Sequence, residues 1–342
     1  MKIGIDASRC SSVESTGTEN YSNLLIPPLI KILKEEGQQI ILYTKKSFDR
    51  KFDGVNIKKI KNKYLWTHLG LGPHSFFDGV DRLFIPAHVV PVLTPLKTIT
   101  YIHDVCFEEI PFAYSFLNRW YLRLMTAEAV RKSRLITHSK YSAEMIKKYF
   151  KTGDKKILIV PPGKIEITNG DSVIPWKKPF ILFVGRIETK KNIIAILSAF
   201  DELLCRNPGI PYSLVLIGKE GFGSQEIFNF HKMMKNNNRV IFGGYVSESI
   251  KDTTLRNASG VIAPSLCEGS SLVLTEARSA NVPFAANSCG ALEEAGGSKG
   301  IYNRNDWSES LRRLISNPIF PEPITRTWDE VAKEVAKVII SG

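Results

Sequence analysis

The sequence predicts an α/β protein with two consecutive Rossmann-like, doubly wound units, each built on a parallel sheet. Three observations lead to this fold class. The chain has 342 residues, which is more than one hydrophobic core usually serves. Short apolar runs alternate with amphipathic stretches of helical spacing, as in sheets that are covered by helices. A Pro/Gly segment at positions 161–163 separates two such series.

The first series predicts an N-terminal domain over residues 1–165. A helix is expected over Tyr21–Glu36, ended by Gly37, and a polar stretch from 161 to about 175 reads as the linker between domains. The strands expected in this domain are Lys2–Asp6, Gln39–Tyr43, Arg82–Ile85, Thr98–Ile102, Leu135–His138 and Ile157–Val160.

The second series predicts a domain over residues 166–325, with helices at Ile193–Leu204 and Ser271–Ala280. Its expected strands are Phe180–Val184, Leu214–Ile217, Val240–Phe242, Gly260–Ala263 and Phe284–Ala286. Trp328–Ile340 has helical spacing and closes the chain, within a C-terminal segment of residues 326–342. Ligands of open parallel sheets bind beyond the carboxyl ends of the strands, so two such sheets predict a cleft that they both face.

The positive charge of the chain is concentrated in its first half. Residues 1–165 contain 26 Lys and Arg against 15 Asp and Glu, and so carry +11 of the total of +12. This asymmetry fits an anionic partner, and it also fits a charge that only maintains solubility. Nucleic acid is excluded as the partner because no recognition helix, stacking-aromatic series or other known module appears.

The sequence also indicates a compartment. Met1 runs directly into the first strand rather than into a signal peptide. No apolar run reaches the roughly 20 residues that a membrane span needs. We therefore expect a cytoplasmic protein, and the basic first half would allow peripheral contact with the inner face of the membrane. The histidines show no metal-ligand spacing and no C-x-x-C pair is present, so no metal site is predicted.

A glycine and a run of cations follow the expected strand Phe180–Val184. Gly185 lets the backbone approach a ligand closely. Arg186 can fork onto phosphate oxygens, and Lys190 and Lys191 stand at the start of the next helix, whose free amides also favour anions. The segment therefore suggests a diphosphate clamp, although Gly-Arg-x4-Lys alone also fits a solvated basic loop.

Two glutamates, Glu268 and Glu276, are separated by seven residues around a predicted strand-to-helix turn. A carboxylate accepts hydrogen bonds from two vicinal hydroxyls, which makes ribose and hexose natural targets. Glu276 falls about one turn into the helix, on a face that can reach back toward Glu268. Taken alone, the pattern also fits a capping glutamate followed by a surface glutamate.

Together these motifs resemble the retaining, GT-B-fold glycosyltransferases of sequence family 4, also called glycosyl transferases group 1. The resemblance covers nearly the whole chain in the right order. Its segments are Ile5-Asp6 with Thr16–Tyr21, Ile102–Asp104, Val160–Gly163, Gly185–Asn192, Pro264-Ser265 with Glu268-x7-Glu276, Val282-Pro283 and Trp328–Ala332. It implies two domains facing a cleft, and a C-terminal helix (326–342) that packs back on the first domain.

The resemblance implies a role for each matching position. Arg186 and Lys191 would hold the donor diphosphate, Glu268 the transferred sugar and Glu276 the ribose. His103 would reach the sugar from the first domain, and Gly17 would let the first loop approach the diphosphate and acceptor. Catalytic roles thus fall on His103, Arg186, Lys191 and Glu268, and substrate binding on Gly17, Gly185, Tyr245, Ser270, Ser271, Leu272, Val273 and Glu276.

The implied activity is metal-independent transfer of a hexose-type sugar from a nucleoside-diphosphate sugar to an acceptor hydroxyl, with retention. We expect no cofactor, since the chain has no Asp-x-Asp cluster near a strand end. The acceptor would be a glycan or glycolipid, as in lipopolysaccharide or capsule synthesis. Where the family usually has Phe-Gly, this chain has Ser270-Ser271. This departure keeps an inactive nucleotide-sugar binder as an alternative. A second alternative is an epimerase-type nucleotide-sugar enzyme of the same fold.

Overall fold

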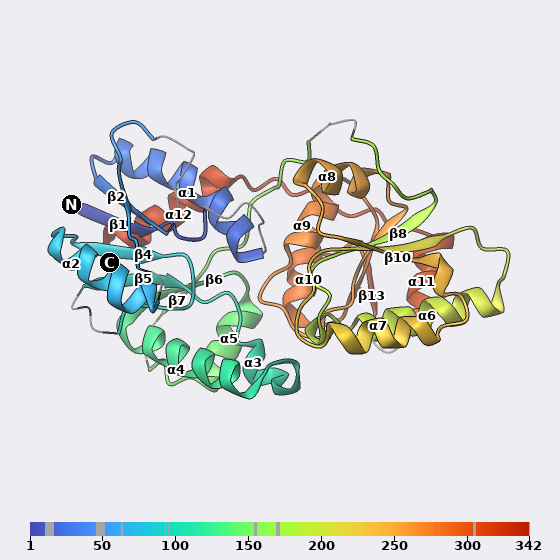
Figure 1. The fold of residues 1–342 in the computed structure, drawn as a ribbon. Coiled ribbons are helices and arrows are strands. Elements are labelled where there is room, and N and C mark those ends of the chain that lie inside the picture. The colour runs from blue at the N-terminus through green and yellow to red at the C-terminus, as the bar shows by residue number, and fades with distance from the viewer. Residues whose placement is uncertain are drawn as a thin grey trace. The chain divides into compact units, whose positions relative to one another are not determined.

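A computed structural model of the chain describes residues 1–10, 17–45, 52–62, 64–92, 94, 96–153, 156–168, 172–303 and 306–341. These residues form two compact units (Figure 1). Unit 1 contains Met1–Glu108, Phe116–Gly163 and Arg326–Gly342, and unit 2 contains Glu109–Ser115 and Lys164–Thr325. Among the described residues, no helix is long and apolar enough to cross a membrane.

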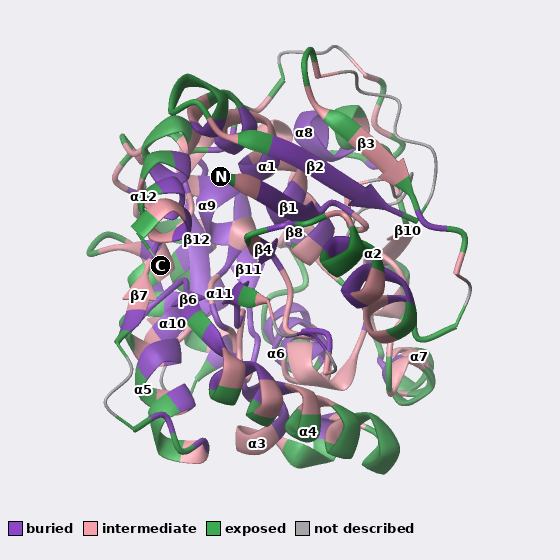
Figure 2. Cartoon of the chain, turned by 90° about the vertical axis from the view of Figure 1, so that its left-hand side faces the viewer, coloured by how far each residue is buried: buried purple, intermediate pink, exposed green. Residues whose placement is uncertain are grey.

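The described part of unit 1 has a seven-stranded sheet, and all of its paired strands are parallel. The strand order is β3-β2-β1-β4-β5-β6-β7, which extends the order of the doubly wound nucleotide-binding fold. The strands are β1 (Lys2–Asp6), β2 (Gln39–Thr44), β3 (Asn56–Lys59), β4 (Arg82–Ile85), β5 (Lys97–Tyr101), β6 (Ser133–Thr137) and β7 (Ile157–Ile159). The central strands β1 and β2 are buried along most of their length (Figure 2).

Helices surround this sheet, and the C-terminal helix α12 packs against α1 within unit 1. Helix α12 brings Trp328 edge-on to Tyr21 of α1, with ring centroids 5.1 Å apart. The helices are α1 (Gly17–Glu35), a π-helix at Trp66–Leu71, α2 (Gly72–Phe77), α3 (Cys106–Glu109), α4 (Phe116–Lys132), α5 (Lys140–Tyr149) and α12 (Trp328–Ser341). A 3-10 turn, Pro111–Ala113, lies in the short segment that groups with unit 2.

Unit 2 has a six-stranded parallel sheet in its described residues, ordered β10-β9-β8-β11-β12-β13. The strands are β8 (Phe180–Val184), β9 (Ser213–Ile217), β10 (Val240–Gly244), β11 (Gly260–Ala263), β12 (Phe284–Asn287) and β13 (Ile301–Asn303). The helical elements are η3 (Thr189–Lys191), α6 (Ile193–Arg206), α7 (Ser224–Met233), η4 (Asn237–Arg239), α8 (Glu248–Asn257), α9 (Leu272–Ser279), α10 (Gly290–Gly296) and α11 (Trp307–Ser316).

The core of unit 2 lies on both faces of its sheet. Ile181 and Phe183 of β8 pack into a cluster with residues of α6 and α11. Phe180 and Leu182 pack into a second cluster, which contains residues of α8 and α9. Successive side chains of a strand point to opposite faces, so a strand buried on both faces needs an unbroken apolar run. The sequence Phe-Ile-Leu-Phe-Val of β8 has this property, and the prediction of two parallel-sheet α/β domains is confirmed.

Candidate active site

The two motifs of unit 2 follow two adjacent central strands. Gly185-Arg186 follows β8, Pro264–Glu268 follows β11, and β8 pairs with β11 in the middle of the sheet. The chain direction of the crossovers reverses at this pair. In open α/β sheets, ligands bind outside the carboxyl ends of the strands at this switch point. The fold therefore brings both motifs to the position where such proteins bind ligands.

Glycines follow β8 and β9 at the carboxyl edge of the sheet of unit 2, so these residues place no side chain of their own over the backbone there. Gly185 has φ of 151°, a conformation that favours glycine. Gly218, which follows β9, also has a positive φ of 144°. A Cβ atom on Gly218 would lie 1.9 Å from the carbonyl oxygen of Gly185, so no other residue fits there. The ends of β8 and β9 are thus held close together without side chains between them.

The cations of the first motif contact a glutamate of the second. The ammonium of Lys191 donates a hydrogen bond to Glu268 Oε1. The Lys190 ammonium lies 4.0 Å from Glu268 Oε2. Arg186 is half-exposed, with Nε 3.5 Å from Glu188 Oε2. Lys191 and Glu268, which belong to two different motifs of the sequence, are therefore neighbours. Lys190, the other lysine of the suggested diphosphate clamp, is a second cation near Glu268.

Glu268 is held in its ionised form. Burial alone would raise the pKa of its carboxyl, but the charges of Lys191 and Lys190, and hydrogen bonds from Lys191 and Ser265, together lower that pKa below the ordinary 4.5. An ionised carboxylate offers only acceptors, which suits sugar hydroxyls. The Lys191 ammonium has three N–H donors and gives one to Glu268, so it keeps donors for a phosphate group.

The turn Ser270–Val273 opens helix α9. Ser271 is its N-cap, and the Ser271 hydroxyl accepts a hydrogen bond from the amide of Leu274 at 3.2 Å. The first amides of a helix have no partner within the helix. Within the described residues, the amides of Leu272 and Val273 donate to no acceptor outside the helix either. They therefore provide unpaired donors at the positive end of the helix dipole.

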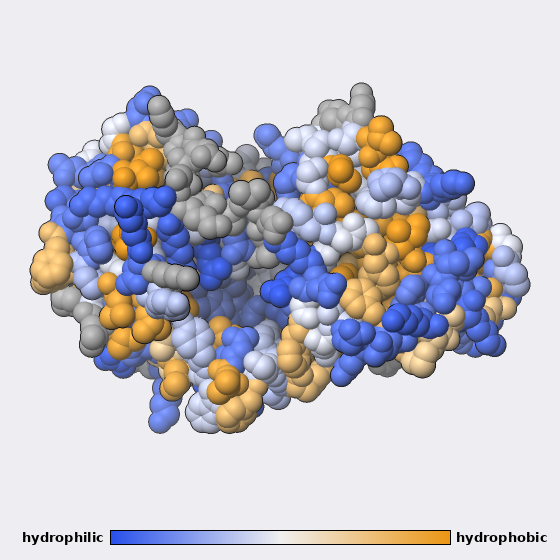
Figure 3. Space-filling model, in the orientation of Figure 1, coloured by the Kyte–Doolittle hydropathy of each residue, from blue (hydrophilic) through white to orange (hydrophobic). Residues whose placement is uncertain are grey.

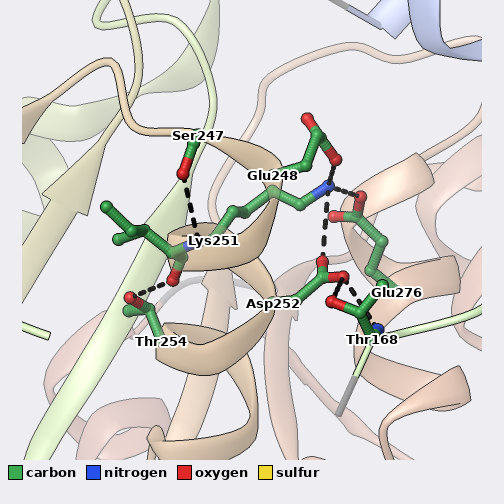
Figure 4. A network of polar contacts seen from close by, with 8 residues as sticks. Thr168, Ser247, Glu248, Lys251, Asp252, Thr254 and Glu276 are labelled. Atoms are coloured by element: carbon green, nitrogen blue, oxygen red, sulfur yellow. Dashed lines mark hydrogen bonds and ion pairs between the residues drawn. The ribbon is translucent and has the colours of Figure 1, made fainter. Parts of the chain in front are cut away.

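Glu276 lies on α9 but is paired with a residue that the sequence reading did not single out (Figure 4). Its Oε1 accepts a hydrogen bond from the ammonium of Lys251 at 2.6 Å. Lys251 belongs to α8, where Glu248 also accepts from it at 2.6 Å. The two predicted glutamates thus have different lysine partners. No motif pointed to Lys251, because a lysine inside an amphipathic helix usually marks its solvent face.

Tyr245, a substrate-binding candidate from the sequence, directly follows Gly244, the last residue of β10. Gly244 has φ of 63°, and the register of β10 shifts between Phe242 and Gly244. Tyr245 is partly exposed, and the ammonium of Lys219 lies 4.8 Å from the centre of its ring. The aromatic face of Tyr245 is therefore already in contact with a cation.

In unit 1, Gly17 is exposed at the start of α1, and a Cβ on it would meet nothing within 4 Å. Thr16, the residue before it in the predicted glycine loop, lies outside the described residues. The structure thus places Gly17 at a helix N-terminus, and its predicted contacts with the donor and acceptor stay a prediction.

His103 follows β5 and belongs to a cluster that the sequence reading did not foresee. Its neighbours are His88, which follows β4, and His138, which follows β6. The amide of His103 donates to His88 Nε2 at 2.7 Å. The imidazoles of His103 and His88 are stacked, with ring centroids 5.6 Å apart. The carboxyl ends of three neighbouring strands therefore carry three histidines in contact.

Both ring nitrogens of His103 are engaged. Nε2 lies 2.9 Å from the carbonyl oxygen of Pro86, which only accepts, so Nε2 carries the proton and donates. Nδ1 then accepts from His138 Nε2 at 2.7 Å. Burial lowers the pKa of both imidazoles below 6.5 and favours their neutral forms. A sugar hydroxyl could bind either nitrogen only by replacing one of these partners.

Comparison with known proteins places this geometry in a family. The family model described as "Glycosyl transferases group 1" matches residues 164–334, half of the chain. A D-inositol 3-phosphate glycosyltransferase of Actinosynnema mirum is 28% identical over 211 residues, which cover 54% of this chain and 49% of that protein. The chain spans about half the length of the curated relatives it matches.

Solved structures share the fold across nearly the whole chain. WaaG, a glycosyltransferase involved in lipopolysaccharide biosynthesis, matches with a TM-score of 0.70 at 16% identity, covering 100% of both chains. HepE of Anabaena in complex with UDP-glucose matches with a TM-score of 0.65 at 15% identity, covering 99% of this chain and 95% of that one. The architecture is therefore that of GT-B glycosyltransferases, and the chain belongs to the glycosyl transferases group 1 family.

Proposed function

We propose that this protein is a retaining glycosyltransferase that moves a hexose-type sugar from a nucleoside-diphosphate sugar to an acceptor hydroxyl, without a metal. One observation carries the proposal. Lys191 of the Gly-Arg-x4-Lys segment is ion-paired with Glu268 of the Glu-x7-Glu segment at the switch point of unit 2. A cation that suits a diphosphate and a carboxylate that suits a sugar thus lie side by side, as a nucleotide sugar requires.

The diphosphate would be held by charge and by amides. Arg186 provides a planar fork for phosphate oxygens, and Lys191 provides a compact charge. The free amides of Leu272 and Val273 add donors at the N-terminus of α9. When the glycosyl–phosphate bond breaks, negative charge grows on the departing diphosphate, and fixed cations and dipoles aimed at it lower the barrier.

The sugar and the nucleoside would be read by the two glutamates. Glu268, kept ionised by its lysines, would accept hydrogen bonds from hydroxyls of the transferred sugar. Glu276 would accept from the ribose hydroxyls, and residues 244–246 would contact the base. The solved structure of HepE with UDP-glucose, a protein of the same fold, supports a nucleotide sugar as the ligand class.

Retention is proposed through attack on the same face of the sugar that the diphosphate leaves. The acceptor oxygen forms the new bond to the anomeric carbon, the glycosyl–phosphate bond breaks, and the leaving phosphate takes the acceptor's proton. Glu268 is not the nucleophile in this scheme, because the acceptor oxygen itself attacks the anomeric carbon. The contact of His103 with the sugar belongs to the same proposal, and it requires His103 to exchange one hydrogen-bond partner.

The acceptor is proposed to be a glycan or glycolipid at an anionic membrane surface. Helix α4 exposes large apolar side chains, among them Leu117 at 80% and Phe116 at 71%. Figure 3 shows hydrophobic side chains along the lower left edge of the view, where Figure 1 places α4. Trp120 and Tyr121 are also partly exposed on this helix. Aromatic and aliphatic groups on a basic unit are typical of surfaces that rest on anionic lipid.

Co-sedimentation with liposomes tests this surface. We expect binding to vesicles with anionic lipid, and weaker binding by Leu117→Ser, which removes one exposed apolar group from α4. Equal binding to neutral and anionic vesicles would contradict the electrostatic part of the proposal. WaaG, which shares this fold and is involved in lipopolysaccharide biosynthesis, supports a glycolipid as the class of acceptor.

A thermal-shift screen of UDP, GDP, ADP and their sugars tests the donor. A ligand at a hundredfold excess over its dissociation constant stabilises the folded state by about 2.7 kcal/mol. We expect stabilisation by one nucleotide and its sugars, followed by sugar transfer to an acceptor in a product assay. Epimerised or hydrolysed product without transfer would indicate the epimerase-type alternative, and binding without any product would indicate an inactive binder.

A further inference from the structure

The strongest feature that the proposed function leaves unused is a lysine enclosed by carboxylates. Lys251 is only 8% exposed. Its ammonium lies 2.6 Å from Glu248 Oε2, 2.6 Å from Glu276 Oε1 and 3.9 Å from Asp252 Oδ1 (Figure 4). Asp252 is in turn fixed by Thr168, whose amide and hydroxyl both donate to Asp252 Oδ2 at 2.9 Å.

This cluster joins two segments that the proposed function assigns to the nucleoside. Glu276, on α9, is expected to accept hydrogen bonds from the ribose hydroxyls. Helix α8, which carries Lys251, is capped by Ser247, directly after the segment 244–246 that is expected to contact the base. Lys251 therefore connects the first turn of one helix with the ribose-reading carboxylate of another.

The electrostatic balance depends on Lys251. A buried ammonium is costly unless it is paired. Burial would lower the pKa of Lys251, but the neighbouring carboxylates of Glu276 and Glu248 raise it well above 10.5. Burial raises the pKa of Glu276 above 4.5, and the charges of Glu248 and Asp252 add to this shift, whereas Lys251 opposes it. Lys251 is thus the group that favours the ionised form of the Glu276 carboxyl.

The geometry leaves one oxygen of Glu276 available. Oε1 accepts from Lys251, and within the described residues Oε2 accepts no hydrogen bond. An ionised carboxylate fixed through one oxygen presents the other in a defined direction and without a proton of its own. Such a group can accept from a vicinal pair of hydroxyls, but it cannot donate to them.

We infer that Lys251 is a positioning residue of the nucleoside site, which holds the Glu276 carboxylate by one oxygen so that the other accepts from the ribose hydroxyls. This inference rests on the proposed function, because it takes Glu276 as the ribose reader. The competing interpretation is a purely structural ion pair between α8 and α9, and the readout must separate the two.

Discrimination between ribose and 2′-deoxyribose provides that readout. The dissociation constants of UDP, GDP and ADP are compared with those of dUDP, dGDP and dADP for the wild type and for Lys251→Met, Lys251→Gln and Glu276→Gln. We expect the wild type to prefer at least one ribonucleotide, and Glu276→Gln to lose that preference. Lys251→Met should reduce it about tenfold, the order of one charged hydrogen bond, with 2′-deoxynucleotide affinity nearly unchanged.

A double variant sharpens the result. Once Glu276→Gln has removed the carboxylate, adding Lys251→Met should cost no further discrimination, because the two residues act through one group. Ribonucleotide affinity should fall at acidic pH as Glu276 takes up a proton. In Lys251→Met this fall should begin at a higher pH, because Lys251 no longer opposes the rise in the pKa of Glu276. The matched control is Lys132→Met, which removes a half-buried lysine ion-paired with Glu128 in unit 1 and should leave discrimination unchanged.

The outcomes are distinguishable. If Glu276→Gln loses discrimination but both Lys251 variants keep it, the inference about Lys251 is overturned and the proposed function stands. If the wild type shows no preference in any pair, or Glu276→Gln keeps it, the ribose assignment itself fails. If neither Lys251 variant folds, the residue has a structural role and the positioning role is rejected.

Discussion

The residues that follow the central strands differ in chemistry between the two units: those of unit 2 are charged and ion-paired, and those of unit 1 are histidines in contact with one another. In unit 2, β8 and β11 lead to charged groups that pair across motifs, with Lys190 and Lys191 around Glu268. In unit 1, β4, β5 and β6 lead to histidines whose pKa values, where shifted, are lowered by burial. One doubly wound topology thus supports an ionic site in one unit and a neutral hydrogen-bonded site in the other. The strand order determines where a site lies, and the residues after each strand determine its chemistry.

The largest effect should follow from removing the carboxylate of the ionic site. Glu268→Ala removes the carboxylate that is proposed to accept hydrogen bonds from the transferred sugar. It also leaves Lys190 and Lys191 without the carboxylate that they share. We expect the turnover rate for sugar transfer to fall by roughly 10²–10³, the usual cost of losing one fixed electrostatic contact in an active site. Steady-state kinetics would measure this.

The control is Glu309→Ala, which removes an exposed glutamate paired with Arg312 on α11 and should not change turnover. Unchanged turnover in Glu268→Ala would show that the ion pair with Lys191 has only a structural role.

Substitution in the histidine cluster of unit 1 should lower the free energy of unfolding. His138→Ala removes a buried ring that donates to His103 Nδ1. We expect a loss of about 2–4 kcal/mol in the free energy of unfolding, from the cavity and the lost hydrogen bond. Hydrogen exchange followed by mass spectrometry would place the loss in peptides of β4, β5 and β6. Equal losses in β8 and β11 would contradict a site confined to unit 1.

A smaller effect concerns pH. Burial lowers the pKa values of His103 and His138 below 6.5, so the unfolded chain binds more protons than the folded chain at mildly acidic pH. Stability is therefore fully present above pH 6.5 and falls as the pH decreases below it, by at most about 1.4 kcal/mol per pH unit for each histidine. Exchange protection of β5 and β6 at pH 7.5 and 5.5 measures this slope. Retention of the same slope in the double variant His103→Gln, His138→Gln would refute the assignment to these residues.

Much of unit 2 could be predicted because its strands are short, apolar and separated by recognisable turns. The range Phe180–Val184 agrees with β8, and the loop motifs followed their strands as expected. Strands β3 and β13 were missed. The strand β3, Asn-Ile-Lys-Lys, is polar and nowhere buried, and β13 has only three residues. Strand β3 therefore lacks the apolar pattern on which the prediction relied, and β13, although two of its three residues are buried, is too short to show one.

The partners of the predicted site residues could not be predicted. Lys251 pairs with Glu276 across 25 residues and His138 with His103 across 35. Such contacts depend on which strands and helices become neighbours, and periodicity does not encode this. No sequence motif marks His138, which is buried and hydrogen-bonded to His103 in the structure.

The central claim is that Arg186 and Lys191 of unit 2 bind the diphosphate of the donor. Calorimetric titration tests this claim most directly. UDP, GDP and ADP are compared with UMP, GMP and AMP for the wild type, Arg186→Ala and the control Arg312→Ala. We predict that the wild type and the control bind one diphosphate more tightly than its monophosphate, and that Arg186→Ala reduces this preference about tenfold. An undiminished preference in Arg186→Ala, or none in the wild type, would contradict the claim.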